Sequence, residues 1–531
     1  AAARPPWARL LPEMLQAAGY RTYHSGKWHI DGQPRAVGFD RSLDIGAAAQ
    51  NDYFTANSVT EDGKGVAQTK DFYATTAIGD HAVRCLKDHA ANHADQPFFN
   101  YVAFTAPHFP LHAPQQLVQS YRERYRAGWN AVQEARFSRI KKMGLVQSVL
   151  PPLEADVGPP YADGNLQKVL GNKEVLFPVP WASLTPEQSE FQATKMAIHA
   201  AMVEGMDQQI GLIVTQLEAM NALENTLLIF ASDNGASAEI MIRGAGHDSQ
   251  APAGGEKTFL CLGPGWSSCA NTPLRRHKTW VHEGGIATPL VVHWPKGFTA
   301  RGDLRQPMVH LMDVTPTVLE VAGITPFGQQ AGQTAPAMQG RSFLATFADN
   351  TATVHDDLWW CHEGNRAVRV GDWKLVAANN TAWELYDMAH DRGETTNLAD
   401  KEPQKVVALS DRWQQLAAEC QALSTAPVSA PASAPAKPAK AAQHPRPNII
   451  YVMTDDQGYG DIGAHGNRFL QTPRLDRFRA QSVRLLEFHA SPTCAPTRAA
   501  LLTGRHEFHA GVTHTIHERE RLALSAITLP Q

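Results

Sequence analysis

The stretch NIIYVMTDD, residues 448–456, decides the fold class of this chain of 531 residues. Its apolar residues do not alternate with polar ones, which is typical of a strand buried on both faces of a sheet covered by helices. Three other apolar runs end in polar groups or a turn: residues 97–108 (PFFNYVAFTAPH), 225–235 (NTLLIFASDNG) and 287–295 (ATPLVVHWP). A long helical pattern lies between them, over residues 192–220. Strands that alternate with helices predict an α/β fold.

The character of the chain changes at about residue 357. Short strand-like pieces with Gly and Asn turns follow, and then a helical pattern over Pro403–Leu423. These features predict a small antiparallel α+β subdomain over residues 351–423. The Pro/Ala-rich tract over residues 424–447 cannot form a core, and we interpret it as a linker. The main domain then comprises residues 1–350, its larger part, and residues 448–531.

Composition excludes several classes of protein. The formal net charge is −4, so charge gives no reason to expect nucleic-acid binding. No apolar run approaches the ~18 residues of a membrane-spanning helix, and residue 1 does not begin a recognisable signal peptide. Six cysteines are too few for a disulfide scaffold. Cys261 and Cys269 could close a loop as a disulfide, or they could be two unrelated core residues, and the sequence favours neither.

Two predicted strands end in oxygen-rich side chains. Asp455 and Asp456 follow the strand at 448–454, while Asp233 and Asn234 follow the run at 225–232. Taken singly, each pair is more typical of a turn or a helix cap. Ligands of α/β sheets bind beyond the carboxyl ends of the strands, so the two pairs together suggest one site for Ca²⁺ or Mg²⁺.

Three further segments carry basic groups and histidines. In GKWH, Lys27 and His29 are two residues apart and would point to one face of an extended backbone, which suits an anion and a proton transfer. His108 lies at a strand end between two prolines, and Lys278 belongs to the basic segment LRRHK. In isolation, GKWH would more often be a surface loop, and the basic segment would be solvated surface.

The segment SPTCAPTRAALLTGR, residues 491–505, is the most distinctive motif. Pro496 favours the first turn of a helix, which places Cys494 at or just before the helix N-terminus. Free N–H groups and the helix dipole favour an anion there. Arg498 lies one turn further on and can reach back toward Cys494.

With this motif the chain resembles the type I sulfatases, in which C-x-P-x-R followed by T-G-R marks a cysteine that is oxidised to formylglycine. The resemblance covers nearly the whole chain, through the segments at 448–461, 491–505, 26–29, 106–108, 232–235, 274–285 and 383–399. It implies the alkaline phosphatase-like fold: a large mixed sheet sandwiched by helices, with a small C-terminal-type antiparallel α+β subdomain. It also implies a sulfuric ester hydrolase, similar to bacterial arylsulfatases, whose nucleophile is the hydrated aldehyde.

The resemblance implies a role for each matched residue. Asp455, Asp456, Asp233 and Asn234, with the modified Cys494, would bind a divalent cation, usually Ca²⁺, with Mg²⁺ as an alternative. Arg498 and Lys27 would hold the hydrated aldehyde, and Lys278 and His108 would bind the sulfate and assist the departing alcohol. His29 would accept the proton that frees sulfate, and His362 is a further candidate for the pocket wall.

The implied partners are a sulfate-ester small molecule or a sulfated glycan, and a formylglycine-generating or sulfatase-maturing enzyme. A periplasmic or secreted location is the expectation for the family. Two alternatives remain open: a phosphonate monoester or phosphodiester hydrolase of the same superfamily, and a catalytically silent metal-binding protein if Cys494 is not converted. Segments such as residues 133–179 would determine the substrate.

The order of the motifs differs from that of the family. The family runs from the Asp-Asp strand and the cysteine motif to GKWH, whereas here these first two segments come last. Joining Gln531 to Ala1 restores the family order. The sequence therefore predicts a circular permutation, in which the two ends lie close together and the Pro/Ala tract joins the former ends.

Overall fold

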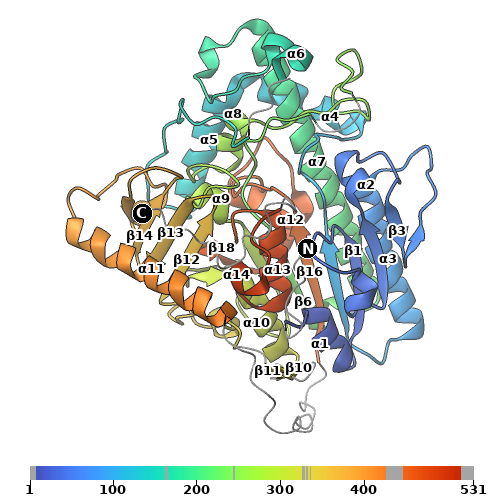
Figure 1. The fold of residues 1–531 in the computed structure, drawn as a ribbon. Helices are drawn as coiled ribbons and strands as arrows, with labels where there is room; N and C mark the ends of the chain where they lie inside the picture. The colour runs from blue at the N-terminus through green and yellow to red at the C-terminus, as the bar shows by residue number, and fades with distance from the viewer. Residues whose placement is uncertain are drawn as a thin grey trace.

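A mixed sheet forms the centre of the computed structural model, which describes residues 8–161, 166–242, 246–325, 329–330, 333–334, 337–425 and 446–515 (Figure 1). Within these residues the sheet has ten strands. In spatial order they are β4 (Lys64–Gly65), β3 (Val59–Glu61), β2 (Arg41–Ile45), β1 (Arg21–Gly26), β5 (Phe98–Ala103), β16 (Asn448–Thr454), β6 (Thr226–Ser232), β7 (Leu290–His293), β17 (Val483–Leu485) and β8 (Leu304–Arg305).

The middle of the sheet is parallel, and antiparallel pairings occur on both sides of it. Strands β2, β1, β5, β16 and β6 run in one direction, while β3, β4 and β7 include antiparallel pairings. Strand β16 lies between β5 and β6, with Tyr451 paired with both Tyr101 and Ile229. A segment from the end of the chain therefore occupies the centre of the sheet, and the carboxyl ends of four adjacent parallel strands, β1, β5, β16 and β6, meet at one edge.

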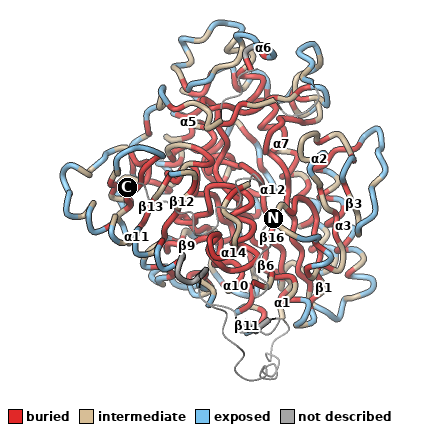
Figure 2. The backbone as a smooth tube through the Cα atoms, in the orientation of Figure 1, coloured by how far each residue is buried: buried red, intermediate tan, exposed pale blue. Residues whose placement is uncertain are grey.

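Alternate residues of each central strand belong to two different cores. In β16, Ile450 and Val452 pack in one cluster, whereas Ile449, Tyr451 and Met453 pack in the other. The first face is covered by α3 (Ala74–Asn92), α4 (Gln115–Tyr121), α5 (Gly128–Lys142), α7 (Pro186–Ala219), α8 (Pro264–Ala270) and α12 (Pro473–Arg479). The second is covered by α1 (Leu11–Ala17), α10 (Val314–Val321) and α13 (Cys494–Thr503). Figure 2 shows the resulting buried centre. The predicted sheet sandwiched by helices is confirmed.

A separate antiparallel sheet with one long helix confirms the predicted α+β subdomain. Its strands are β12 (Asp357–His362), β13 (Asn365–Val370), β14 (Trp373–Ala377) and β15 (Glu384–Asp387), and α11 (Pro403–Thr425) packs on one face. The boundaries 1–350, 351–423 and 448–531 stay predictions. Most of the predicted linker, residues 426–445, lies outside the described residues, as do Ala1 and Gln531, so the predicted circular permutation also stays a prediction.

Buried ion pairs attach the small sheet to the main domain. Lys374 Nζ on β14 lies 2.8 Å from Glu283 Oε1, at the start of α9 (Glu283–Ile286), and 2.8 Å from Glu394 Oε1. Arg369 on β13 pairs with Glu487. These side chains are nearly inaccessible to solvent, so each charge depends on its partner.

Short elements complete the described part of the chain. They are α2 (Ala47–Asn51), α6 (Leu166–Leu170), α14 (Glu507–Ala510), β9 (Val309–His310), β10 (Gln329–Gln330), β11 (Gln333–Thr334) and β18 (Phe488–His489). Cys261 and Cys269 are both buried free thiols, so the disulfide is not formed and the core interpretation holds. Among the described residues, no helix combines the length and the apolar character needed to cross a bilayer.

Candidate active site

The predicted site residues meet at the edge of the sheet where the four parallel strands end. Lys27 and His29 follow β1, and His108 follows β5. The Asp455–Asp456 pair follows β16, and the Asp233–Asn234 pair follows β6. The structure therefore brings together side chains that lie more than 400 residues apart in the chain, as the pattern of strand ends predicted.

Backbone contacts fix these strand ends. A Cβ on Gly26, which has a φ of +127°, would collide with the carbonyl oxygen of Ala103, and the next amide, that of Lys27, donates to the same oxygen at 2.8 Å. A Cβ on Gly235 would collide with the carbonyl oxygen of Gly284, so the segment after Lys278 packs directly on the end of β6. The close approach of these backbones requires glycine at both positions.

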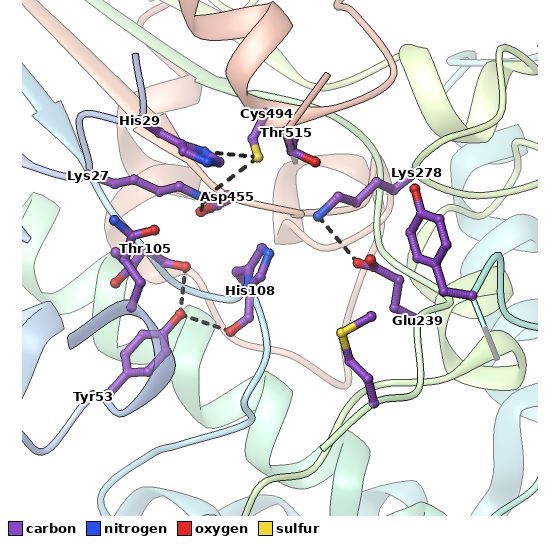
Figure 3. Close-up of a pocket in the computed structure, with 13 residues that line it drawn as sticks. Lys27, His29, Tyr53, Thr105, His108, Glu239, Lys278, Asp455, Cys494 and Thr515 are labelled. Atoms are coloured by element: carbon purple, nitrogen blue, oxygen red, sulfur yellow. Dashed lines mark hydrogen bonds and ion pairs between the residues drawn. The ribbon is translucent and has the colours of Figure 1, made fainter. Parts of the chain in front are cut away.

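Cys494 is the first residue of α13 and is 1% exposed. Its Sγ lies 3.3 Å from His29 Nδ1 and 3.7 Å from Lys27 Nζ (Figure 3). Burial raises the pKa of the Cys494 thiol to about 11, although Lys27 and Lys278 oppose the shift. The predicted helix start is confirmed.

The reason given for pairing Lys27 with His29 is wrong. The backbone at His29 has a φ of +58° and is not extended, so the strand alternation ends at Gly26. The turn nevertheless brings both side chains to Cys494. Burial, together with the charge of Lys27, holds the pKa of His29 well below its usual value, so its imidazole is neutral near pH 7.

Arg498 is fully buried below the site and is more a support than a direct neighbour of the sulfur. Its guanidinium donates to Asp233 Oδ2 at 2.9 Å and to the carbonyl oxygen of Lys27 at 3.0 Å. The described contacts include no hydrogen bond from Arg498 to Cys494. It therefore fixes the ends of β1 and β6 relative to α13.

The oxygen-rich side chains form a buried group with unused ligand atoms. Asp455 Oδ2 accepts from Lys27 Nζ at 2.6 Å, while its Oδ1 has no hydrogen-bond partner. Asn234 donates to Asp456 Oδ1 at 2.7 Å, and its own Oδ1 has no partner. Ligand atoms of Asp233, Asp455 and Cys494 lie within 4.8 Å of one another.

The buried carboxylates of Asp233, Asp455 and Asp456 repel one another. Burial and the nearby charge of Asp455 raise the pKa of Asp233 to about 7, and burial raises that of Asp456 to about 6, against the opposing charge of Lys278. Asp456 also has a φ of +63°, an uncommon conformation for a residue other than glycine. Crowded carboxylates and orphaned buried oxygens fit a hard divalent cation.

Lys278 and His108 lie beside Asp456 and line a cavity of about 380 Å³. Lys278 Nζ lies 3.0 Å from Asp456 and 3.4 Å from Glu239 Oε2. His108 Nδ1 donates to the carbonyl oxygen of Phe109 at 2.6 Å, and its Nε2 lies 3.7 Å from Asp456 Oδ2. Two lysines and two histidines thus line the cavity, with Lys27 and His29 on one side and Lys278 on the other.

Comparison with known proteins identifies the family of this chain. The sulfatase family model matches residues 2–324 and 447–531, and a second model, described as N-sulphoglucosamine sulphohydrolase, C-terminal, matches residues 276–421. The chain belongs to the sulfatase family. The first model takes in the cavity-lining segments before and after the small subdomain, and the second model includes that subdomain.

Individual relatives agree with the family. An uncharacterised sulfatase of Schizosaccharomyces pombe is 31% identical over 77% of this chain and 76% of its own, and an arylsulfatase of Klebsiella aerogenes is 31% identical over 63% and 72%. The crystal structure of Ps i-CgsB shares the fold, with a TM-score of 0.52 and 20% identity over 78% of this chain and 76% of that chain. This chain is therefore a sulfatase, an enzyme that hydrolyses sulfate esters.

Residues that the sequence did not single out also line the cavity of this sulfatase. The further side chains that line its cavity are Gln50, Tyr53, Thr105, Tyr161, Glu239, Met241 and Thr515. Tyr53 donates to the carbonyl oxygens of Thr105 and His108 at 2.6 and 2.8 Å, and so fixes the His108 loop. Glu239 could have been noticed as a carboxylate five residues beyond Asn234. His362, the further candidate, is not among the lining residues.

Proposed function

We propose that this sulfatase cleaves sulfate monoesters of small, arylsulfatase-type substrates with a nucleophile formed from Cys494. The supporting observation is the position of Cys494 on the first turn of α13, between Lys27, His29 and the Asp455 carboxylate. A buried thiol is a weak nucleophile for this reaction, whereas the hydrate of formylglycine would supply an oxygen nucleophile. A formylglycine-generating or sulfatase-maturing enzyme would be the partner that converts Cys494.

Asp455, Asp456, Asp233 and Asn234 would hold the cation, with Ca²⁺ preferred and Mg²⁺ possible. Their unused oxygens and the crowding of the carboxylates support this assignment. A bound divalent cation would neutralise charge on the sulfate and lower the pKa of a hydroxyl next to it.

The remaining side chains divide the work of binding and proton transfer. Lys27, held by Asp455 and 3.7 Å from Sγ, would orient the nucleophilic group, and Arg498 would keep Lys27 and Asp233 in place. Lys278 projects into the cavity and would bind a sulfate oxygen.

The two histidines lie where protons must move. His29 Nδ1, 3.3 Å from Sγ, would accept a proton from the group that replaces the thiol. His108 donates through Nδ1 to a backbone carbonyl and lines the cavity, where with Lys278 it would assist the departing alcohol.

The substrate class is inferred from the cavity and from relatives. Tyr53, Tyr161 and Met241 provide apolar surface around the polar groups, which suits an aromatic ring or a sugar face. The Klebsiella relative is an arylsulfatase, and a 24% identical relative in Bacteroides thetaiotaomicron, covering 73% of this chain and 68% of its own, is an N-acetylglucosamine-6-O-sulfatase. Aryl sulfates and sulfated sugars are therefore the substrates to test, and a periplasmic or secreted location is proposed from the family.

The experiment compares turnover of p-nitrophenyl sulfate with that of bis-p-nitrophenyl phosphate and a phosphonate monoester. Protein is co-produced with a maturing enzyme, and Cys494→Ala is the control. We expect the sulfate ester to be cleaved fastest, and only by the protein that retains Cys494. Faster cleavage of the diester or phosphonate would overturn the proposal in favour of the alternative hydrolase. Equal activity of Cys494→Ala would exclude Cys494 as the source of the nucleophile.

A further inference from the structure

A second group of metal-ligating side chains lies beyond the cavity wall, apart from the Asp455 group. His362 and Glu363 lie at the turn between β12 and β13, and His514 follows α14. His514 Nε2 lies 2.7 Å from Glu363 Oε1, and the two imidazole rings stack with centroids 5.0 Å apart. One ligand atom from each of the three residues lies within 4.8 Å of the others.

His362 has an unused nitrogen in a buried position. The residue is 3% exposed, and its Nε2 has no hydrogen-bond partner. Its ring also hydrogen-bonds the backbone of Thr513, the residue before His514. Histidines that bind metals commonly donate one ring N–H to a backbone carbonyl and offer the other nitrogen to the metal, because the first contact fixes the ring and its tautomer. Without a metal, a buried imidazole nitrogen that makes no hydrogen bond destabilises the folded protein, because its lost hydration is not replaced.

Glu363 occupies a turn position whose backbone conformation does not favour glutamate, so we explain the residue by the contacts of its side chain. Glu363 has a φ of +47° and Gly364 a φ of +82°, in a two-residue hairpin that pairs His362 with Asn365. Asn-Gly and Asp-Gly are the usual choices for such a turn. Glutamate reaches further than either, and its Oε2 accepts from Tyr161 at 3.0 Å while Oε1 faces His514.

We propose that His362, Glu363 and His514 bind a transition-metal cation of the Zn²⁺ type. Two imidazoles and one carboxylate suit Zn²⁺, whereas Ca²⁺ prefers oxygen ligands alone. Around Zn²⁺, ligand atoms lie roughly 3.4 Å apart, so Glu363 and His514, which now lie 2.7 Å apart, would rearrange by about 1 Å to bind the ion. Glu363 is on a turn and 27% exposed, which leaves room for that movement.

Metal binding there would brace one wall of the active-site cavity. Tyr161, bonded to Glu363, and Thr515, next to His514, both line that cavity. The metal would join the small subdomain, through the β12–β13 turn, to residues 511–515 of the main domain. The site shares no ligand with the Asp455 group, so its occupancy does not depend on conversion of Cys494.

The test titrates Zn²⁺ into protein that carries no affinity tag, in the presence of saturating Ca²⁺, by isothermal calorimetry, with the zinc content after gel filtration measured by elemental analysis. Glu363→Gln and His514→Gln remove one ligand each while keeping similar size. His390→Gln is the matched control, because His390 forms a similar histidine–carboxylate pair with Asp387 at 2.9 Å on the surface. Circular dichroism and thermal melting confirm that each variant is folded.

We expect one zinc ion per chain in the native protein and in His390→Gln. Affinity should fall at least about tenfold in Glu363→Gln and in His514→Gln, since ligand loss outweighs the 10- to 100-fold effect of supporting residues. Zinc binding of unchanged affinity in the two ligand variants would overturn the proposal, because the ion would then be held elsewhere. No zinc binding by the native protein would overturn it as well.

Discussion

Glu239 should set the preference of this sulfatase for sulfate over phosphate esters. It is a buried carboxylate on the cavity wall, 3.4 Å from Lys278 Nζ, and it is not part of the proposed cation site. A sulfate monoester carries one negative charge, whereas a phosphate monoester carries nearly two at about pH 8, above its second pKa of about 6. The additional charge of the phosphate should be repelled by Glu239.

The size of the effect follows from the geometry. An ester oxygen bonded to Lys278 Nζ at about 2.8 Å, opposite the carboxylate, would lie about 6 Å from Glu239. At that distance one additional charge costs about 3 kcal/mol at an effective dielectric constant of about 20, and about half of that in a wetter pocket. Glu239→Gln should therefore raise the ratio of phosphate to sulfate kcat/KM by about ten- to a hundredfold.

The assay measures kcat/KM for p-nitrophenyl phosphate and p-nitrophenyl sulfate at pH 8, normalised to the fraction of converted Cys494. The ratio is the informative quantity, because any loss of Lys278 positioning affects both esters. Glu239→Asp keeps the charge. Ser237→Ala removes the two hydrogen bonds between the Ser237 hydroxyl and Glu239, in which the hydroxyl donates to Oε2 at 2.7 Å and accepts from the backbone amide at 3.1 Å. Both controls should leave the ratio within about threefold of the native value. An unchanged or lower ratio in Glu239→Gln would refute the electrostatic argument.

Three further predictions concern the metal and the buried charges. Removal of divalent cations with a chelator should abolish turnover, and added Ca²⁺ or Mg²⁺ should restore it; full activity in the chelated enzyme would exclude the cation site. In metal-free protein, Arg498→Met should lower the free energy of unfolding by about 3–5 kcal/mol, because it removes the ion-pair partner of the buried Asp233; a loss below about 1 kcal/mol in urea melts would contradict this. Burial and the nearby charge of Glu283, opposed by the charge of Lys374, raise the pKa of Glu394 to about 7. The free energy of unfolding should therefore fall by up to about 3 kcal/mol as the pH rises from about 5 to 8. Urea melts at each pH should show that Glu394→Gln removes this dependence. The same slope in the variant would assign it to another group.

Most of the central sheet could be predicted because its strands are unbroken apolar runs. The segments at 448–454 and 98–103 show this pattern; Asp455 follows the first directly, and His108 comes five residues after the second. The position of a strand within the sheet could not be predicted, because local pattern does not encode long-range pairing. The run at 287–295 illustrates this limit: it resembles the parallel strands, yet β7 runs antiparallel to β6. The two-residue edge strands, β4 and β8, carry too little pattern to be recognised.

The site was predictable where a motif specifies it and not where packing creates it. Cys494 at a helix start follows from Pro496, and the proximity of Asp455 to Asp233 follows from two strand ends. The approach of His29 to Cys494 depends on a left-handed residue, which no periodicity reveals. Glu239 enters the cavity because the chain turns there to pair it with Lys278, a contact set by tertiary structure.

Peptide mass spectrometry shows whether Cys494 is the precursor of the nucleophile. Trypsin should release residues 485–498, which contain Cys494, from protein co-produced with a maturing enzyme. We expect a peptide about 18 Da lighter than the cysteine form, in a fraction that rises in proportion to the turnover of p-nitrophenyl sulfate across preparations. Sulfatase turnover in protein whose peptide retains the unmodified mass would contradict this expectation.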